Sequence, residues 1–273
     1  MNNKKKALIF FLLILLTFTL SACGQNKNYN VYQETKKAKT INWGVKADTP
    51  LFGSIDIKTG QIRGFEIDLA TALTHKMYGK SAKANFVTTT ANTKIQLLKN
   101  RNVDAVIAAM TITPERKKQV DFSKPYFPAG QSIMVAKNSK IKNVYALNNK
   151  RVLVVKGTTS IDAVHKYAPK ADVLQFDDYG QAFAALKAGQ GDALVTDNGI
   201  LAGILHDNSG FKLVGGTFTN QPYGIAVNKG QKQMMNKINA ALTELRKDGT
   251  YNRLVKKWFG NIPGFDIKDI EKQ

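Results

Sequence analysis

Three short polar stretches of the sequence carry side chains suited to the two charged groups of a small zwitterion. In AMTITPER, Thr111 supplies a hydroxyl and a backbone N–H, and Arg116 supplies a planar guanidinium that matches a carboxylate. In VVKGTTS, Thr158 and Thr159 offer further hydroxyl and N–H donors. In VTDNG, Asp197 offers a carboxylate to a buried cation, which needs opposite charge and acceptors. An α-amino acid presents both charges, so the pattern predicts a site for such a molecule.

Each stretch also has a purely structural interpretation, which its spacing leaves open. Thr113 can cap a helix whose first residue is Pro114, and Arg116 then lies in solvent. The stretch 158–160 and Asp197 can likewise be ordinary N-caps. A phosphate-binding loop is excluded, because the G-x-x-x-x-G-K-[ST] spacing is absent.

The elements that position these residues alternate between β-rich and helical segments in two successive series. In the first series we expect strands at 41–45, 84–88 and 103–109 and helices at 65–77 and 93–99. In the second series we expect strands at 151–155, 173–175 and 193–196, and helices that begin at 160 and span 179–187. LKNRNVDAVI and LKAGQGDALV repeat one spacing, with Leu-Lys at a helix end and Asp-Ala at a strand start. The order predicts two similar α/β lobes with parallel strands.

Two segments that combine proline, an aromatic residue and glycine are predicted to connect the lobes. They are PYFPAG and QPYGIA, and each precedes a strand-like run. A chain that crosses twice between two lobes forms a hinge, and we assign the hinges to residues 126–130 and 221–225. The predicted lobes are then 40–125 plus 226–273, which includes a helix at 234–246, and 131–220.

We interpret the first 39 residues as a signal peptide followed by a tether, rather than as part of a folded unit. Three lysines precede an apolar run from Ala7 to Leu20, shorter than the ~20 residues of a spanning helix, so residues 1–22 are predicted to be a signal peptide. LSACG looks like a bacterial lipoprotein cleavage box, and Cys23 would become the lipidated N-terminus of a polar tether, residues 23–39. A free cysteine behind an ordinary signal peptide is the alternative. We expect an exported protein, anchored by lipid to the outer face of the bacterial cytoplasmic membrane.

The formal net charge of the chain is +20, which raises the question of a nucleic-acid partner. The lysines are dispersed along the sequence, and the export signal argues against nucleic acid. We therefore expect a solvated basic surface, suited to an anionic cell envelope, and no nucleic-acid partner.

Six motifs resemble, in order, the extracellular solute-binding proteins of polar amino acid ABC importers. They are GFEIDLATAL, TITPERKKQVDFSKPYF, VKGTTS, LKAGQGDALVTD, PYGIAVNKG and DGTYNRLVKKWFG, within residues 41–260. The resemblance implies a two-lobed periplasmic-binding-protein-like type II fold with two hinge crossovers. It also implies a monomer that captures an amino acid and delivers it to a complex of an ABC permease and an ATPase.

The same resemblance assigns roles to the site residues. Arg116 would bind the ligand α-carboxylate together with Thr111 and the backbone of residues 158–159. Asp197 and the carbonyl of Ala109 would hold the α-ammonium. Many relatives read Ala-Gly where this chain has Ala-Ala before Met-Thr, a departure at Ala109 that concerns the backbone contacts.

The ligand side chain is expected to meet Phe52 and two lysines. Phe52 matches one member of an aromatic clamp, whereas Ala91 stands where glutamine-type relatives carry a second aromatic residue. GVKADTPLFG and TTTANTKIQLL resemble the glutamate/aspartate branch, in which Lys46 and Lys94 would meet a distal carboxylate. Both can instead be solvated lysines. The resemblance thus favours glutamate or aspartate, with glutamine close behind.

Two other classes of protein compete with a binding protein. A dehydratase-like enzyme on the same scaffold would need a positioned acid or base, yet His75, His165 and His206 join none of the site motifs. No Ser-His-Asp arrangement or metal-ligand spacing is present, and we expect no catalytic residue, metal or cofactor. A ligand-sensor domain would need a following transmembrane segment or kinase, which we do not expect.

Replacing Cys23 tests the lipid anchor. Cys23→Ala should release the protein into the medium or leave its signal peptide uncleaved, because no other anchor is predicted. Membrane fractionation and the mass of the mature chain measure this, with Ser21→Ala as a control that keeps the cysteine. A signal-cleaved Cys23→Ala protein that stays in the membrane fraction contradicts the lipoprotein prediction.

Overall fold

The computed structural model describes residues 29–262 and 270 of the chain. The predicted signal peptide, residues 1–22, and the predicted lipidation site Cys23 lie outside these described residues. Within the described part, no helix is both long and apolar enough to cross a lipid bilayer.

The first of two five-stranded sheets combines strands that are far apart in the sequence. Its order is β5 (Lys83–Thr88), β1 (Thr40–Val45), β6 (Ala105–Val106), β13 (Ala226–Asn228) and β7 (Val120–Phe122). β1 runs parallel to β5 and β6, whereas β13 runs antiparallel to β6 and β7. Ile41, Trp43 and Val45 alternate along β1 and are completely buried, which fixes the register of this strand against the core.

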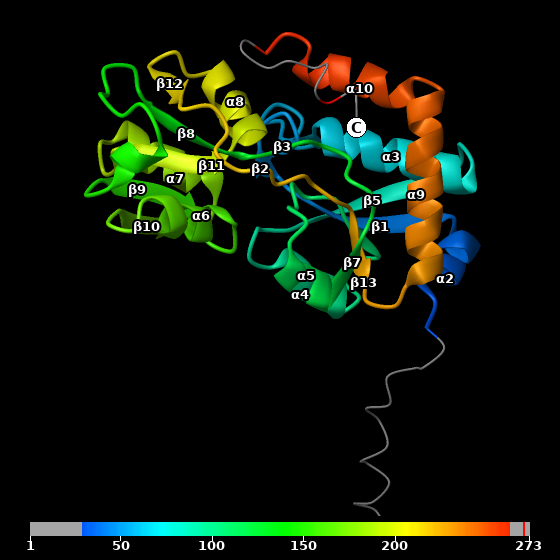
Figure 1. Ribbon diagram of the computed structural model, residues 1–273. Helices are drawn as coiled ribbons and strands as arrows, with labels where there is room; N and C mark the ends of the chain where they lie inside the picture. Colours follow the sequence, from blue (N-terminus) through cyan, green and yellow to red (C-terminus); the bar gives the residue numbers. More distant parts are fainter. Residues whose placement is uncertain (1–28, 263–269, 271–273) are drawn as a thin grey trace, which may run out of the picture. The chain divides into compact units, whose positions relative to one another are not determined.

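Helices surround this first sheet (Figure 1). They are α2 (Val31–Ala38), α3 (Phe65–Tyr78), α4 (Lys94–Lys99), α5 (Pro114–Gln119), α9 (Lys232–Lys247) and α10 (Thr250–Phe259). A small antiparallel sheet of β2 (Asp48–Thr49), β3 (Gly53–Ile55) and β4 (Ile62–Arg63) leads from β1 into α3. The helices α3, α9 and α10 pack on one another beside the first sheet.

Helix α2 corrects part of the predicted tether. Val31, Tyr32 and Thr35 are buried, and the Val31 N–H donates to Oε1 of Gln231 at 2.9 Å. The prediction that residues 23–39 form only a tether is therefore wrong for residues 31–38. This eight-residue helix has only three hydrophobic residues, too few to show a helical repeat in the sequence, so tertiary packing decides its conformation.

The second sheet repeats the directions of the first. Its order is β10 (Asp172–Phe176), β9 (Arg151–Val155), β11 (Ala193–Asp197), β8 (Gln131–Ala136) and β12 (Phe211–Val214). β9 runs parallel to β10 and β11, whereas β8 runs antiparallel to β11 and β12. The surrounding helices are α6 (Ser160–Tyr167), α7 (Tyr179–Lys187), α8 (Asn198–His206) and the 3₁₀ turn η2 (Val144–Leu147). The predicted repeat of two α/β lobes is confirmed, and each sheet adds antiparallel strands to its parallel ones.

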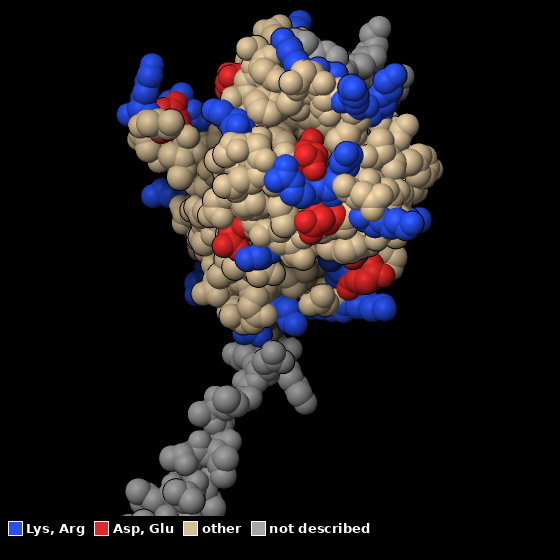
Figure 2. Space-filling model, turned by 90° about the vertical axis from the view of Figure 1, so that its left-hand side faces the viewer, with Lys and Arg blue, Asp and Glu red and all other residues tan. Residues whose placement is uncertain are grey.

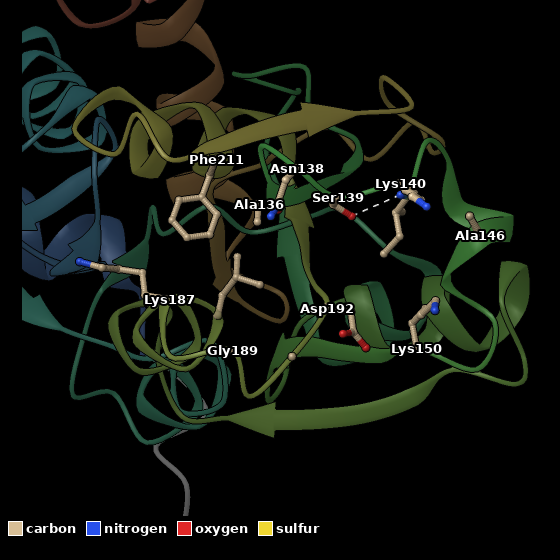
Figure 3. Close-up of a pocket in the computed structure, with 13 residues that line it drawn as sticks. Ala136, Asn138, Ser139, Lys140, Ala146, Lys150, Lys187, Gly189, Asp192 and Phe211 are labelled. Atoms are coloured by element: carbon tan, nitrogen blue, oxygen red, sulfur yellow. Dashed lines mark hydrogen bonds between the residues drawn. The ribbon is translucent and has the colours of Figure 1, made fainter.

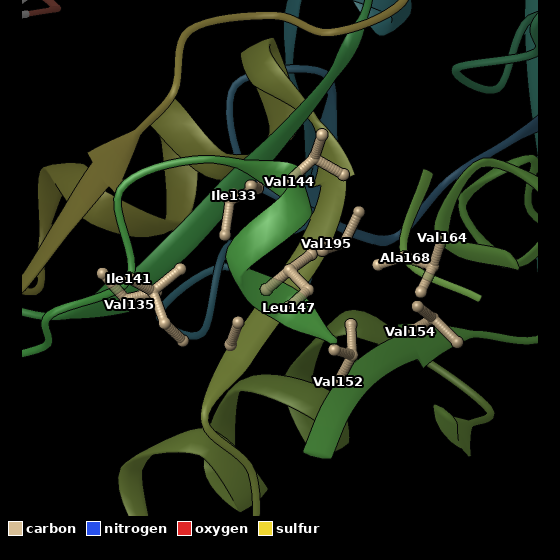
Figure 4. Packing of buried hydrophobic residues seen from close by; sticks show 11 residues of the cluster. Ile133, Val135, Ile141, Val144, Leu147, Val152, Val154, Val164, Ala168 and Val195 are labelled. Carbon is tan, nitrogen blue, oxygen red and sulfur yellow. The ribbon is translucent and has the colours of Figure 1, made fainter. Parts of the chain in front are cut away.

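An aliphatic cluster fills one side of the second sheet (Figure 4). Val152 and Val154 of β9 and Val195 of β11 face Leu147 of η2, and all four are completely buried. β-branched side chains suit a pleated surface that is buried, which is why VLVV forms a central strand here.

The two segments that connect the sheets run beside each other. The Tyr126 N–H donates to the Tyr223 carbonyl at 2.9 Å, and the Tyr223 N–H donates to the Phe127 carbonyl at 2.9 Å. After the first connection the chain enters the second sheet as β8, and after the second connection it returns to the first sheet as β13. The assignment of these segments as hinges stays a prediction.

Charged side chains are scattered over the face of the molecule that Figure 2 shows. Lysines and arginines lie among acidic and uncharged residues there, and no continuous basic stripe is visible. This distribution agrees with the dispersed lysines of the sequence.

Candidate ligand-binding site

A narrow cavity of about 10 Å³, room for about one water molecule, lies where residues of the two sheets meet. The residues that line it follow strand ends or begin helices, where side chains and free backbone groups converge. They are Lys46, Ala91, Lys94, Ala108, Ala109, Thr111, Arg116, Thr158, Thr159, Tyr179 and Asp197. The cavity therefore brings together every ligand residue predicted from the sequence except Phe52.

Buried charged side chains hold the backbone that follows β6, at residues 108–111, which we name the site segment. Nζ of Lys94 donates to the Ala108 carbonyl at 3.0 Å, and Oε1 of Glu66 accepts the Ala109 N–H at 2.7 Å. Ala109 has a φ of 43°, a left-handed conformation that costs a residue with a Cβ about 1–2 kcal/mol. These two contacts fix a strained segment in one conformation.

Arg116 belongs to the cap of α5 and to the cavity at once. Oγ1 of Thr113 accepts the Arg116 N–H at 3.1 Å, and Pro114 occupies the first turn, as the sequence predicted. The guanidinium does not lie free in solvent, because Nη1 donates to the Thr111 carbonyl at 2.9 Å and Nη2 to the Gly157 carbonyl at 3.0 Å. A guanidinium has five N–H donors, so others stay available to a ligand.

Gly157 lets the loop before α6 approach the first half of the protein closely. Its φ is 74°, and a Cβ at this position would lie 2.8 Å from Cα of Asn92. Oγ1 of Thr158 donates to the Val155 carbonyl at 2.6 Å, and Oγ1 of Thr159 donates to Oε1 of Gln221 at 2.8 Å. Since Thr159 makes no side-chain cap, the ordinary N-cap interpretation fails for this residue.

Asp197 ends β11 and points its carboxylate at the cavity rather than at the helix that follows. Its side chain makes no cap bond to α8, and its oxygens accept Nε2 of Gln131 and the hydroxyl of Tyr223, each at 2.6 Å. Burial raises the pKa of Asp197 to about 6, although the Tyr223 hydrogen bond and the charges of Lys94 and Arg116 lower it. Near neutral pH this side chain is an anion that can bind an ammonium group.

Glu66 is a completely buried acid behind the site segment. The hydroxyl of Tyr126 also donates to its Oε1, and within the described part of the chain no group donates to its Oε2. Burial raises the pKa of Glu66, which the hydrogen bonds and the charge of Lys94 oppose. Burial and the neighbouring cations Arg116 and Lys46 place the pKa of Lys94 well below its usual value.

The two lysines assigned to the ligand side chain are buried, with exposures of 2% for Lys46 and 3% for Lys94. Nζ of Lys46 lies 2.9 Å from Oδ1 of Asp48 and 5.3 Å from the centroid of the Tyr179 ring. Neither lysine is a solvated surface residue. Each already has an acceptor within the protein, Asp48 for Lys46 and the Ala108 carbonyl for Lys94.

The structure contradicts the predicted place of Phe52. Its ring is completely buried and packs edge-on against Phe127 and Phe259, with centroids 4.8 Å and 5.3 Å away, and it does not line the cavity. Leu51, at a φ of 68°, turns the chain so that Phe52 points inward. Tyr179 lines the cavity instead, from the first position of α7.

Several residues that contact the site were not assigned from the sequence. They are Asp48, Glu66, Gln131, Tyr179 and Tyr223. Tyr179 follows a strand end, and the rule that selected Asp197 could have found it. Glu66 lies inside the quoted motif GFEIDL, where an acid between apolar residues was the available signal.

A larger hollow of about 500 Å³ in the second half has a different character (Figure 3). Lys140, Lys150 and Lys187 lie at its rim and are exposed, and Asp192 is paired with Arg151 at 3.3 Å. It holds no buried charge, so the small cavity is the stronger candidate site.

Comparisons with known proteins find similar sequences and similar folds. Residues 41–261 match the bacterial extracellular solute-binding proteins, family 3. The chain is 46% identical to the ABC transporter glutamine-binding protein GlnH of Bacillus subtilis (strain 168), over 93% of this chain and 98% of that protein. It is 45% identical to the glutamine-binding protein of Geobacillus stearothermophilus, over 74% of this chain and 78% of that protein. The structure of an ancestral arginine-binding protein bound to glutamine is 46% identical, with a TM-score of 0.76, and covers 82% of this chain and 99% of that one.

Replacing Ala109 by glycine tests the strain in the site segment. Ala109→Gly should raise the free energy of unfolding by roughly 0.5–1 kcal/mol, because glycine adopts a positive φ without a steric cost. Urea unfolding measures the change. Ala105→Gly in β6 is the matched control and should lower the free energy of unfolding. A less stable Ala109→Gly protein means that the strain is absent.

Proposed function

The chain belongs to the bacterial extracellular solute-binding proteins, family 3, and we propose that it captures glutamine and delivers it to an ABC import permease. Family membership makes it an amino-acid-binding transport protein rather than an enzyme, as its sequence predicted. The choice of glutamine goes further and rests on the electrostatics of the cavity.

The observation that carries this choice is the balance of charge around the cavity. Among the described residues that line the cavity or bond directly to its lining, the basic side chains are Lys46, Lys94 and Arg116, and the acidic ones are Asp48, Glu66 and Asp197. An amino acid with an amide side chain has no net charge and keeps this balance. Glutamate would bring an uncompensated negative charge and arginine an uncompensated positive one, and both are costly in a buried site.

The preference for glutamate or aspartate depended on a lysine that is free to meet a distal carboxylate. Asp48 already neutralises Lys46, and the Ala108 carbonyl already accepts from Lys94. We therefore place glutamine first. The names of the two bacterial relatives described above, both glutamine-binding proteins, support the same order.

The cavity offers partners for both α-groups of the ligand. In this proposal Arg116 donates its remaining N–H groups to the α-carboxylate, with Thr111 and the backbone of residues 158–159. Asp197 accepts from the α-ammonium together with the Ala109 carbonyl. Each Asp197 oxygen keeps lone pairs after accepting one neutral donor.

We further propose that the lobes close around the ligand by rotation at residues 126–130 and 221–225, and that the protein acts as a monomer anchored through a lipid on Cys23.

Calorimetry with glutamine, glutamate and arginine tests the ligand. The protein should bind glutamine at least about tenfold more tightly than either charged amino acid, after carried-over ligand has been removed by unfolding and dialysis. Asp48→Asn is the matched variant. It removes the counter-ion of Lys46 and should shift the preference toward glutamate. Equal or tighter binding of glutamate by the unchanged protein contradicts a neutral ligand.

Replacing Arg116 by lysine tests the carboxylate contact. Arg116→Lys keeps the charge but loses the planar pair of donors, which should cost on the order of 2 kcal/mol, or roughly 30-fold in affinity. Calorimetry measures the loss and circular dichroism confirms folding, with the exposed Lys118→Arg on the same helix as the control. A folded Arg116→Lys protein with unchanged affinity would remove Arg116 from the mechanism.

A further inference from the structure

Each connection between the two sheets carries a buried tyrosine that binds a buried acid of the site, Glu66 behind the site segment or Asp197 in the cavity. The hydroxyl of Tyr126, on the first connection, donates to Oε1 of Glu66. The hydroxyl of Tyr223, on the second, donates to Oδ2 of Asp197 at 2.6 Å. Both tyrosines are completely buried. The two acids serve opposite halves of the site, since Glu66 holds the site segment and Asp197 ends β11.

The second connection is also paired by its backbone with residues 110–112, which overlap the end of the site segment. The Gly224 N–H donates to the Met110 carbonyl at 3.0 Å, and the Ile112 N–H donates to the Pro222 carbonyl at 3.0 Å. Tyr223 lies between these two bonds. Its backbone is therefore tied to the first half of the protein while its hydroxyl reaches the acid of the second half.

We propose that Tyr223 is a positioning residue, which orients the Asp197 carboxylate toward the ligand ammonium and couples that carboxylate to the connection between the lobes. The proposal rests on the proposed function only in requiring a ligand with an α-ammonium. Tyr126 holds Glu66 in the corresponding way but does not contact Asp197. The pair thus supplies a test variant and a matched control.

The direction of the Tyr223 hydrogen bond is fixed by its surroundings. Burial, and then the charge of Asp197, raise the pKa of Tyr223 well above its usual value, so the hydroxyl keeps its proton and donates. The other groups that face Asp197 are Gln131 of β8, Lys94 of α4, Arg116 of α5 and Tyr179 of α7. None of these side chains lies on the connection.

The pH dependence of binding separates a positioning role from a general structural one. Asp197 must be ionised to hold an ammonium, so affinity falls as the pH drops through its pKa of about 6. The Tyr223 hydroxyl stabilises the ionised form, and its removal raises that pKa. The pH range over which the affinity falls on acidification, the acid limb of the binding profile, then moves to higher pH.

Calorimetry from pH 5 to pH 8 on Tyr223→Phe and Tyr126→Phe tests the proposal. Tyr223→Phe should lower the affinity about tenfold at neutral pH and move the acid limb upward by about one pH unit. Tyr126→Phe should leave the acid limb in place. An unmoved limb in Tyr223→Phe, or an equal shift in both variants, overturns the proposal.

A direct titration keeps the proposal testable if Tyr223→Phe binds too weakly for calorimetry. The carboxyl carbon resonance of Asp197 in ¹³C-labelled protein should titrate about one pH unit higher in Tyr223→Phe than in the unchanged protein. An unchanged midpoint overturns the proposal. Since all α-amino acids carry the same ammonium, a preference for another amino acid overturns the choice of glutamine alone. Failure of every amino acid to bind overturns both proposals.

Discussion

A charged group removed from water must find opposite charge or hydrogen bonds inside the protein, and the cavity is organised by this requirement. The buried charged side chains satisfy this requirement chiefly by binding one another and backbone groups. Lys94 and Glu66 bind consecutive residues of the site segment, Lys46 pairs with Asp48, and Arg116 spans two carbonyls. The contacts of Lys94 and Glu66 also hold the site segment in its strained conformation. The same hydrogen bonds therefore stabilise the buried charges and determine the shape of the site. A ligand that enters such a site finds its partners already oriented, which limits the ordering that binding must pay for.

The repeated strand order explains how two separate sheets supply one site. In each sheet the strand that enters from a connection runs antiparallel to a strand that leads into the cavity: β13 to β6 and β8 to β11. The connections are thus joined to residues of the site by backbone hydrogen bonds and also by the hydroxyl groups of their two tyrosines. Rotation at the connections and rearrangement of the site are expected to be mechanically linked.

Local chemistry was predictable from the sequence, and long-range packing was not. The cap at Thr113 and the alternation of strands and helices depend on neighbouring residues, which is why the start of α5 and the parallel strands of both sheets were predictable, whereas β7 and β12 were not. Glu66 lies 43 residues from Ala109, and no local pattern indicates that contact. Phe52 turns inward because of one left-handed residue before it, which its own motif does not reveal. Lys46 was identifiable as a site residue, but its pairing with Asp48 depends on a side-chain conformation.

The close approach at Gly157 sets a limit to how small the cavity can become. Backbone meets backbone there, with no space for a Cβ beside Asn92. The two halves cannot move closer at this point, so the main chain itself limits how far the cavity can shrink. In the proposed function, selection by charge instead depends on the charged side chains around the cavity. The two limits come from different parts of the fold, one from a glycine in the main chain and the other from side chains.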